Sequence, residues 1–410
     1  MNKLTLRDID VGGKRLLVRV DFNVPLDEKT GKISDDSRIR AALPTINYLV
    51  DRGAKVILCS HLGRPDGKVV ESLRLTVIAQ HLSSLLGKRV RVTRDCIGPE
   101  AKKASAGLKN GDVLLLENLR FHRAEEENDP AFARALADLA DIYVDDAFGT
   151  AHRKHASVVG VTEYLPSVAG LLMEKELEYL GSMLKNPVHP FGGLVGGAKI
   201  SDKVEMLKNI MGKLDLLLIG GGMAATFLKA KSYEVGLSLV EEDRLDTVAR
   251  LMAEAIERGV RLLLPVDVVV AAEISPEAKG KVVPIEKIPS RQRIVDIGQR
   301  TIRSFSEALR VCKTVFWNGP MGINEIPQFA VGTQAMAKLL ADLDAVTIIG
   351  GGSTTEVVTN MGLADRLTFV STGGGASLSF LSGQKLPGVE ALLDKDSPEA
   401  SRLKSLGGYV

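Results

Sequence analysis

Four glycine-rich turns in the second half of the 410-residue chain have the composition of phosphate-binding segments. They lie at residues 196–197, 220–222, 350–352 and 373–375, and each follows an apolar run and precedes a segment with helical spacing. A bare backbone that passes from a strand into a helix points unpaired N–H groups outward, where the helix dipole also favours negative charge. Any one of these turns has a simpler interpretation as a tight connection. Four of them in one half of the chain favour a phosphate-rich ligand.

The third turn is the most complete example. Residues 346–349 predict the end of a buried strand, and three glycines follow them. Ser353, Thr354 and Thr355 then offer hydroxyl groups that we interpret as helix caps. The helix is predicted to continue from Glu356.

Two lysines follow the first glycine turn. Lys199 and Lys203 are four residues apart, so both would point the same way if residues 199–203 formed the first turn of a helix. Two solvent-facing lysines are the alternative. Their position directly after a glycine turn favours contact with phosphate.

Arginine and histidine gather in the first half of the chain, just after predicted strands. In open α/β sheets the ligand crevice lies outside the carboxyl ends of the strands, so we expect these side chains to meet at one edge of a sheet. Guanidinium groups gathered in a crevice suit a small substrate with several carboxylate or phosphate groups, whereas each arginine alone would be an ordinary surface charge. The clusters contain Arg38, Arg64, Arg120, Arg153, His61 and His152.

The elements that position these residues alternate between strand and helix, which predicts an α/β fold with parallel sheets. In the first half the pattern predicts strands at 14–20, 54–59, 112–116 and 142–144, and helices at 38–50, 75–86 and 132–140. A chain of this length suits two domains. We expect an N-terminal domain at 1–172, a connecting helix and linker at 173–190, and a C-terminal domain at 191–389.

Bulk composition argues against several classes of function. The formal net charge of +2 gives no general attraction to nucleic acid or to a membrane surface. The three cysteines are far apart and odd in number, which favours a reducing compartment. No signal-peptide core opens the sequence, and no apolar run approaches the ~20 residues of a membrane span. We therefore expect a soluble cytoplasmic protein.

Phosphoryl transfer between a small anion and a nucleotide fits a chain that gathers cations in one half and backbone N–H groups in the other. A nicotinamide-dependent dehydrogenase is the rival enzyme class, because Gly220, Gly222 and Ala225 match the dinucleotide pattern and Glu242 follows about twenty residues later. That interpretation leaves three glycine turns and both lysines unexplained. The lack of a Walker A sequence excludes the P-loop ATPases. A non-catalytic nucleotide-binding protein stays open.

Nine separated motifs resemble those of the phosphoglycerate kinase family over nearly the whole chain, residues 3–393. In order they read LLVRVDFNVP, SHLGRP, ENLRF, DAFGTAHR, GGAKISDK, GGGMAATFL, WNGPMG, STGGGASLSFL and LPGVEAL. The resemblance implies two doubly wound, Rossmann-like parallel-sheet domains joined by a hinge helix that close around the ligands. It also implies reversible transfer of the acyl phosphoryl group of 1,3-bisphosphoglycerate to Mg·ADP, giving 3-phosphoglycerate and ATP. We expect a monomer.

The resemblance also implies the site residues, position by position. The phosphoglycerate would be held by Asp21, Phe22, Asn23, Arg38, His61, Leu62, Gly63, Arg64, Arg120 and Arg153. The nucleotide would be held by Ala198, Lys199, Lys203, Gly222, Gly298, Gly319, Glu325, Gly350, Gly351, Gly352, Ser353 and Thr354. The moving phosphoryl group would be neutralised by Arg38, Lys199, Lys203, Gly351 and Gly374. No general base is implied, because the acceptor in the ATP-consuming direction is already a carboxylate.

Two features depart from the family pattern. Ser353 stands where the family usually carries an aspartate that helps to hold Mg²⁺. A hydroxyl is a weaker ligand and brings no charge, so we expect the metal to be held mainly by the nucleotide phosphates and water. Residues 395–410 extend beyond the usual end of the family, and the sequence leaves open whether the tail from residue 390 packs on the N-terminal domain.

Overall fold

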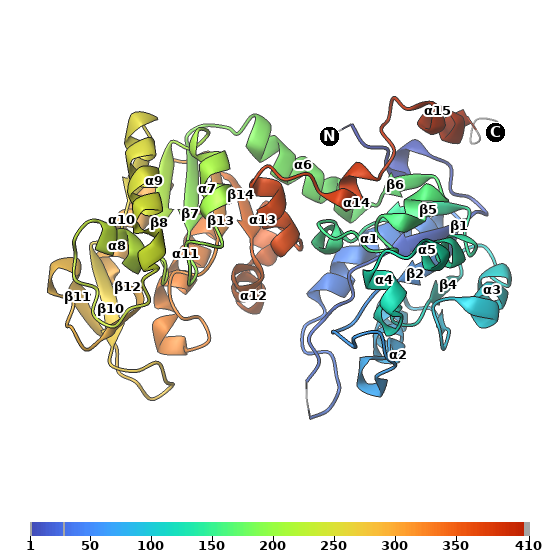
Figure 1. Cartoon of the computed structure of the whole chain (residues 1–410), viewed down its shortest axis with the longest axis horizontal. Helices are drawn as coiled ribbons and strands as arrows, with labels where there is room; N and C mark the ends of the chain where they lie inside the picture. The colour runs from blue at the N-terminus through green and yellow to red at the C-terminus, as the bar shows by residue number, and fades with distance from the viewer. Residues whose placement is uncertain (1, 28, 406–410) are drawn as a thin grey trace. The chain divides into compact units, whose positions relative to one another are not determined.

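The computed structural model describes residues 2–27 and 29–405, which form two compact units. Unit 1 is the described part of Met1–Glu178 together with that of Lys385–Val410, and unit 2 is Tyr179–Gln384. The C-terminal helices α14 (Pro387–Glu390) and α15 (Pro398–Ser405), drawn in red in Figure 1, therefore belong with the blue and green elements of unit 1. Helix α6 (Leu171–Lys185) begins in unit 1 and ends in unit 2.

Unit 1 is built on a parallel six-stranded sheet with the strand order β3-β4-β2-β1-β5-β6. The strands are β1 (Arg15–Arg19), β2 (Lys55–Cys59), β3 (Val90–Val92), β4 (Val113–Leu115), β5 (Ile142–Asp145) and β6 (Ser167–Ala169). The helices before α6 are α1 (Ser37–Asp51), α2 (Thr76–Leu86), α3 (Gly98–Ala106), α4 (Arg123–Glu126) and α5 (Pro130–Ala137). The α/β prediction and the order of the predicted strands and helices of this half are confirmed, whereas β3, α3, α4 and β6 were not predicted.

Strand β1 shows why this sheet is covered on both faces. Leu16 and Val18 belong to a hydrophobic core that also contains side chains of α1 and α2, while Leu17 between them is equally buried and must point to the opposite face. An apolar run buried on both faces is typical of a parallel strand with helices on each side.

The described part of the C-terminal tail packs on unit 1. The Leu4 amide donates a hydrogen bond to the Leu393 carbonyl at 2.7 Å. Ala400 and Leu403 of α15 are buried in the same hydrophobic core as Leu16. The predicted tail also includes residues 406–410, which lie outside the described residues.

Unit 2 contains a second parallel six-stranded sheet, with the order β15-β14-β13-β7-β8-β9. Its strands are β7 (Phe191–Val195), β8 (Leu216–Ile219), β9 (Arg261–Leu263), β13 (Thr314–Asn318), β14 (Val346–Gly350) and β15 (Phe369–Val370). Its helices are α7 (Val204–Met211), α8 (Ala224–Ala230), α9 (Leu245–Glu257), α10 (Gln299–Leu309), α11 (Val331–Asp342), α12 (Gly352–Asn360) and α13 (Gly375–Leu381).

A three-stranded antiparallel sheet in unit 2 was not predicted. It has the order β11-β10-β12, formed by β11 (Lys281–Pro284), β10 (Asp267–Ala271) and β12 (Arg293–Ile297). These strands are drawn in yellow in Figure 1. None of the helices in the described part of the chain is both long and apolar enough to cross a membrane.

Candidate active site

Cationic side chains gather at the carboxyl ends of the strands of unit 1, as predicted. His61 follows β2, Arg120 follows β4 and Arg153 follows β5, while Arg38 lies in the first turn of α1. Burial is the main cause that lowers the pKa of His61 well below its usual value, and the positive charges of these three arginines and of Arg19 act in the same direction. Burial therefore keeps the His61 ring neutral, and the four guanidinium groups lie close enough to reinforce that effect.

The other histidines of this region respond to the same positive field. Burial lowers the pKa of His155 to about 4, and Arg120, Arg19 and Arg153 reinforce the shift. Burial and Arg153 likewise lower the pKa of His152, against the opposing charge of Asp21. Burial disfavours a charge of either sign, so it is the arginine contributions to these shifts that indicate an edge that favours an anion.

Hydrogen bonds fix the loop after β1 against the loop after β2. Asn23 accepts a hydrogen bond from the Gly63 amide through its side-chain oxygen at 2.8 Å. Arg38 forms an ion pair with Asp21. In both pairs the two residues belong to the predicted substrate set, so the structure brings these four together.

Phe22 and Leu62 were predicted to contact the substrate, but their side chains pack in the core of unit 1. Both are buried in the hydrophobic core of unit 1, with exposures of 0% and 2%. The Phe22 amide donates to the Ser60 hydroxyl at 2.9 Å, and the Leu62 amide to the Asn118 side chain at 3.3 Å. These two residues therefore anchor the loops, and their side chains are not available to a ligand.

The predicted arginines differ in how firmly they are held. Arg120 is 3% exposed, donates to the Gly63 carbonyl at 3.0 Å and lies 3.3 Å from a carboxylate oxygen of Glu126. Its Nε is buried without a hydrogen-bond partner among the described residues. Arg64 is exposed and Arg153 is half-buried. Arg120 is therefore held in place, whereas the side chains of Arg64 and Arg153 have room to move onto a bound anion.

A buried network beneath this edge was missed by sequence reasoning. Arg19, at the end of β1, donates to the Ser157 hydroxyl at 2.9 Å and lies 3.1 Å from His61 Nδ1. Ser157 in turn donates to the Glu125 carboxylate at 2.6 Å, and both side chains are fully buried. The only sequence signal was an arginine at the end of an otherwise apolar strand.

In unit 2, two of the predicted glycine turns, at 196–197 and 220–222, line one cavity of about 560 Å³, and Ser353, which follows the third turn, lines it too. Gly222 and Ala198 lie on its wall, and so do Glu325 and Ser353. Apolar side chains from segments far apart in the sequence complete the wall, namely Leu237, Leu239, Ile274, Val295 and Ile323. The apolar side chains suit a flat apolar group of a ligand, and the glycine backbone suits an anionic group attached to it. Sequence reasoning missed this apolar wall, for which the only signal was isolated apolar residues in loops.

The two predicted lysines do not share a helix face. Helix α7 begins at Val204, with Lys203 as its N-cap residue, and residues 201–203 form a turn. Lys203 is 8% exposed and donates a hydrogen bond to the Asn318 side-chain oxygen, whereas Lys199 is exposed. Burial lowers the pKa of Lys203 to about 8, against the opposing charge of Asp202. The condition under which both lysines would point the same way, a helical turn over residues 199–203, is therefore not met.

Glu241, which sequence reasoning did not single out, holds the segment that carries these lysines. Its carboxylate accepts the amides of Ile200 and Ser201 at 2.5 and 3.2 Å. These contacts fix the backbone directly after Lys199 and Ala198.

The third glycine turn forms the predicted strand-to-helix connection, with one correction. Helix α12 begins at Gly352, so Ser353, Thr354 and Thr355 lie inside its first turn and do not cap it. The Thr354 hydroxyl instead accepts the amide of Gly319 at 2.8 Å. The N-cap residue is Gly351, which has no side chain to offer the N–H groups of that turn. This helix end therefore leaves amides available to an anion.

Glycine is required at two positions around this turn. A Cβ on Gly319 would lie 2.3 Å from the Gly196 carbonyl oxygen, and Gly351 has a φ of +92°. Gly350 and Gly351 both pack against the side-chain nitrogen of Asn318, at 3.3 and 3.2 Å from their ideal Cβ positions. The structure thus joins the turns at 196–197, 319 and 350–352 around Asn318.

Two predicted glycines have other surroundings. Gly298 is the N-cap residue of α10, but the Asp267 carboxylate already accepts the amides of Arg300 and Thr301 at 3.1 and 2.8 Å. This helix end is therefore occupied, and Gly298 is not among the residues that line the cavity. Gly374, with a φ of +51°, precedes α13 and has no capping side chain.

The donor set at the third turn fits a magnesium ion that arrives with the nucleotide. Ser353 is exposed and contributes only a hydroxyl, and residues 350–355 contain no carboxylate. A hard cation bound through phosphate oxygens and water needs few protein ligands, in contrast to one held by a protein cage.

Comparison with known proteins identifies the family. The family model described as phosphoglycerate kinase matches residues 6–384. A curated relative named phosphoglycerate kinase, from Pelotomaculum thermopropionicum, is 56% identical over 395 residues, which cover 96% of this chain and 100% of the relative. Another of that name, from Synechococcus elongatus, is 57% identical over 401 residues, with coverage of 96% and 100%.

Solved structures agree with the sequence relatives. The phosphoglycerate kinase structure from Coxiella burnetii matches with a TM-score of 0.84 at 40% identity, covering 95% of this chain and 98% of that one. The structure from Pyrococcus horikoshii OT3 also has a TM-score of 0.84, at 33% identity, with coverage of 98% and 100%. The predicted resemblance is confirmed, and the chain belongs to the phosphoglycerate kinase family.

Proposed function

We propose that the chain reversibly transfers the acyl phosphoryl group of 1,3-bisphosphoglycerate to Mg·ADP, giving 3-phosphoglycerate and ATP. Membership of the family over nearly the whole chain supports this reaction. The observation that carries it is the chemical division between the units: fixed guanidinium groups in unit 1, and glycine-turn amides with a buried lysine in unit 2. The first suits a small polyanion and the second suits a nucleotide.

In unit 1, we propose that the arginines and Asn23 bind and orient the phosphoglycerate. Neutral His61 adds a hydrogen bond without adding charge, because its burial, reinforced by the surrounding guanidinium groups, keeps its pKa low. Arg38 leaves its partner Asp21 in part and neutralises the transferred phosphoryl group. Arg64 and Arg153 contact the ligand's own anionic groups.

In unit 2, we propose that the cavity beside the glycine turns binds the base and ribose, and that the turn at 350–352 binds the phosphates. Mg²⁺ arrives as part of the nucleotide substrate and offsets the charge of its phosphates. Lys199, Lys203 and the amides near Gly351 and Gly374 stabilise the negative charge of the moving phosphoryl group. No protein base is needed, since the attacking group is a carboxylate or a phosphate oxygen.

Transfer also requires the two ligands to meet, so we propose closure by hinge bending about the segment that contains α6. We expect small-angle scattering to show a smaller radius of gyration only when both substrates are present. An unchanged radius with both substrates would contradict closure. We further propose a monomer that works in the cytoplasm, which sedimentation and cell fractionation test.

The direct test is an assay of 3-phosphoglycerate-dependent ATP consumption with the purified chain, at several magnesium concentrations. We expect turnover that needs all three components. Replacing 3-phosphoglycerate by lactate is the matched control and should abolish turnover. Nucleotide binding without turnover, with every substrate present, would leave the non-catalytic nucleotide-binding alternative in place of the kinase.

A further inference from the structure

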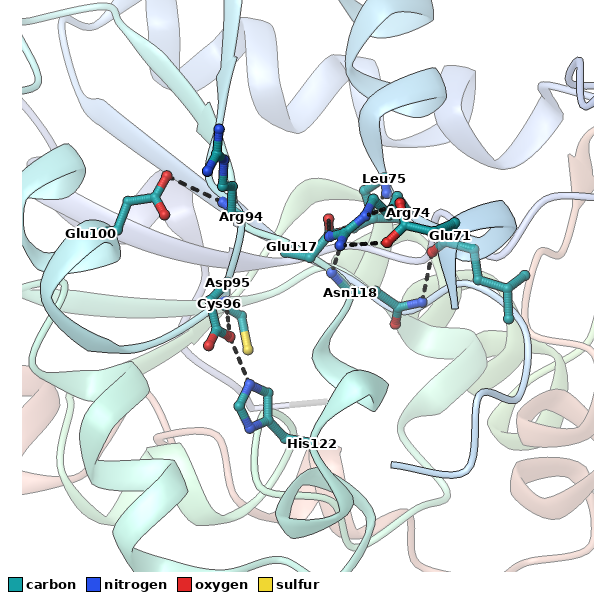
Figure 2. A network of polar contacts seen from close by, with 11 residues as sticks. Glu71, Arg74, Leu75, Arg94, Asp95, Cys96, Glu100, Glu117, Asn118 and His122 are labelled. Carbon is teal, nitrogen blue, oxygen red and sulfur yellow. Dashed lines mark hydrogen bonds and ion pairs between the residues drawn. The ribbon is translucent and has the colours of Figure 1, made fainter. Parts of the chain in front are cut away.

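Three side chains of unit 1 that the proposed reaction does not use meet in one cluster. Asp95 and Cys96 lie in the loop between β3 and α3, and His122 follows the short helix η3 (Leu119–Phe121). Their candidate ligand atoms, a carboxylate oxygen, a sulfur and a ring nitrogen, all lie within 4.8 Å of one another. Figure 2 shows the three side chains converging from these two segments. No second group of three such side chains occurs in the part of the chain that the structure describes.

The contact between His122 and Asp95 is the kind found in a metal site that holds a proton in place of a metal. His122 Nε2 lies 2.6 Å from Asp95 Oδ1. An ionised carboxylate only accepts, so the ring nitrogen is the donor. A cation placed among the three side chains would take over the position of this proton.

One side chain of the cluster is buried in the core, and the other two are partly exposed to solvent. Cys96 is fully buried, whereas the side chains of His122 and Asp95 are 31% and 48% exposed. The His122 ring is held against the Phe132 ring at a centroid distance of 5.2 Å. A metal ion therefore has a path from solvent, two accessible ligands and one ligand fixed in the core.

From this geometry we propose that Asp95, Cys96 and His122 form a zinc site. Thiolate, imidazole and carboxylate are the ligand types of Zn²⁺, with bonds of about 2.0–2.3 Å. Three protein ligands leave one tetrahedral position for water. On binding, the thiol proton passes to solvent and the His122 proton moves from Nε2 to Nδ1.

Such a site would strengthen the link between two segments that are already joined by the contact between His122 and Asp95 at 2.6 Å. Residues just before His122 are already fixed, because Glu117 pairs with Arg74 at 2.9 Å and accepts the Leu75 amide at 2.9 Å (Figure 2). The loop at Asp95 is held mainly by its own bonds, such as that from the Cys96 amide to Asp95 Oδ1 at 2.6 Å. Zinc would add a covalent link between the β3–α3 loop and the segment that carries Arg120.

The test uses Co²⁺ and Zn²⁺ on the purified metal-free chain. We expect one equivalent of Co²⁺ to give a cobalt–thiolate charge-transfer band, and Zn²⁺ to remove it by competition. The Cys96→Ser variant should lose the band, whereas Cys312→Ser, which changes a buried thiol in unit 2, should keep it. Zn²⁺ but not Mg²⁺ should raise the thermal midpoint of the chain in a concentration-dependent way.

His122→Asn provides a second variant with a partly exposed side chain, in case Cys96→Ser does not fold. It should lose the zinc-dependent rise in thermal midpoint. His81→Asn is its matched control, because His81 forms a similar pair with Asp36 at 2.7 Å and has no thiol beside it. A cobalt band that survives in Cys96→Ser, an equal response of both histidine variants, or no band at all would overturn the proposal.

Discussion

Arg19 Nη2 lies 3.1 Å from His61 Nδ1, with both side chains buried in unit 1. A guanidinium can only donate, so Nδ1 must be the acceptor and the neutral His61 ring carries its proton on Nε2. The buried arginine thus sets the tautomer of a residue in the proposed substrate site. It also balances buried acids, because its charge lowers the pKa of Glu125 and of Asp145 against the effect of burial.

Replacing Arg19 by methionine should therefore destabilise unit 1 strongly. We expect a loss of about 3–5 kcal/mol in the free energy of unfolding, because the change leaves buried carboxylates without their cation. Arg15→Met on the same strand is the control. Arg15 pairs with Asp141 at 2.6 Å in a partly exposed position, so its loss should cost at most about 1 kcal/mol. Urea unfolding measures both, and equal losses would contradict the assigned role of Arg19.

Arg19 also shows what the sequence could not reveal. Arginines after strands were predicted because a loop residue at a strand end faces the crevice, and Arg38, Arg120 and Arg153 do lie around His61. Whether a charge within an apolar strand points to a buried network or to solvent depends on neighbouring strands and loops. Those partners, Ser157 and Glu125, are over a hundred residues away in sequence.

The start of α12 and the apolar wall of the cavity were also hard to predict, because both involve contacts between segments that are far apart in the sequence. The sequence suggested that Ser353 to Thr355 cap a helix, but α12 begins at Gly352, and the Thr354 hydroxyl accepts the amide of Gly319 in another turn. Similarly, Leu237 and Ile274 are each 50% or more exposed and carry no periodic signal. Only the folded chain brings them to one wall.

Arg38→Ala should lower kcat far more than it weakens binding of either substrate. Its contact with the transferred phosphoryl group is proposed to form chiefly in the transition state, where removing one such donor costs about 10²–10³ in rate. Arg40→Ala is the matched control, because Arg40 on the same helix is exposed and pairs with Asp36 at 2.9 Å. Steady-state kinetics should show little change for it. A rise in the KM for phosphoglycerate alone in Arg38→Ala would contradict the role in transfer.

The lowered pKa of Lys203 leads us to expect that both stability and nucleotide binding depend on pH. Its folded-state pKa of about 8 lies below the usual 10.5, so the folded chain loses this proton first as the pH rises. Between these values the unfolded chain binds more protons, and the contribution of Lys203 to stability therefore increases with pH. Nucleotide binding should change in the opposite direction, because the ammonium that faces phosphate is lost.

We accordingly expect the KM for ADP to rise as the pH passes about 8. In Lys203→Arg this rise should disappear, since a guanidinium stays protonated. Lys199→Arg is the control, because Lys199 is exposed, and it should retain the rise seen in the original chain. A profile that is the same in Lys203→Arg would show that another group titrates.

Gly351→Ala and its neighbour Gly352→Ala form a matched pair. Gly351 has a φ of +92° and its Cβ would lie 3.2 Å from the Asn318 side-chain nitrogen, whereas a Cβ on Gly352 meets nothing within 4 Å. Strain of about 1–3 kcal/mol should distort the proposed phosphate turn only in Gly351→Ala. We expect its KM for ADP to rise roughly tenfold, as 1.4 kcal/mol implies. A similar rise in Gly352→Ala would point to the loss of free amides instead of strain.

Ser353 places a hydroxyl in the first turn of α12 and on the wall of the proposed nucleotide cavity, where a carboxylate would bring a charge to the metal. If Mg²⁺ is held by phosphate oxygens and water, an added carboxylate supplies one more hard ligand. Ser353→Asp should therefore lower the magnesium concentration that gives half-maximal rate. Ser353→Asn is the matched control, because it adds a similar side chain without the charge and should change that concentration much less. An unchanged or higher magnesium requirement in Ser353→Asp would mean that a carboxylate elsewhere in the chain already serves the metal.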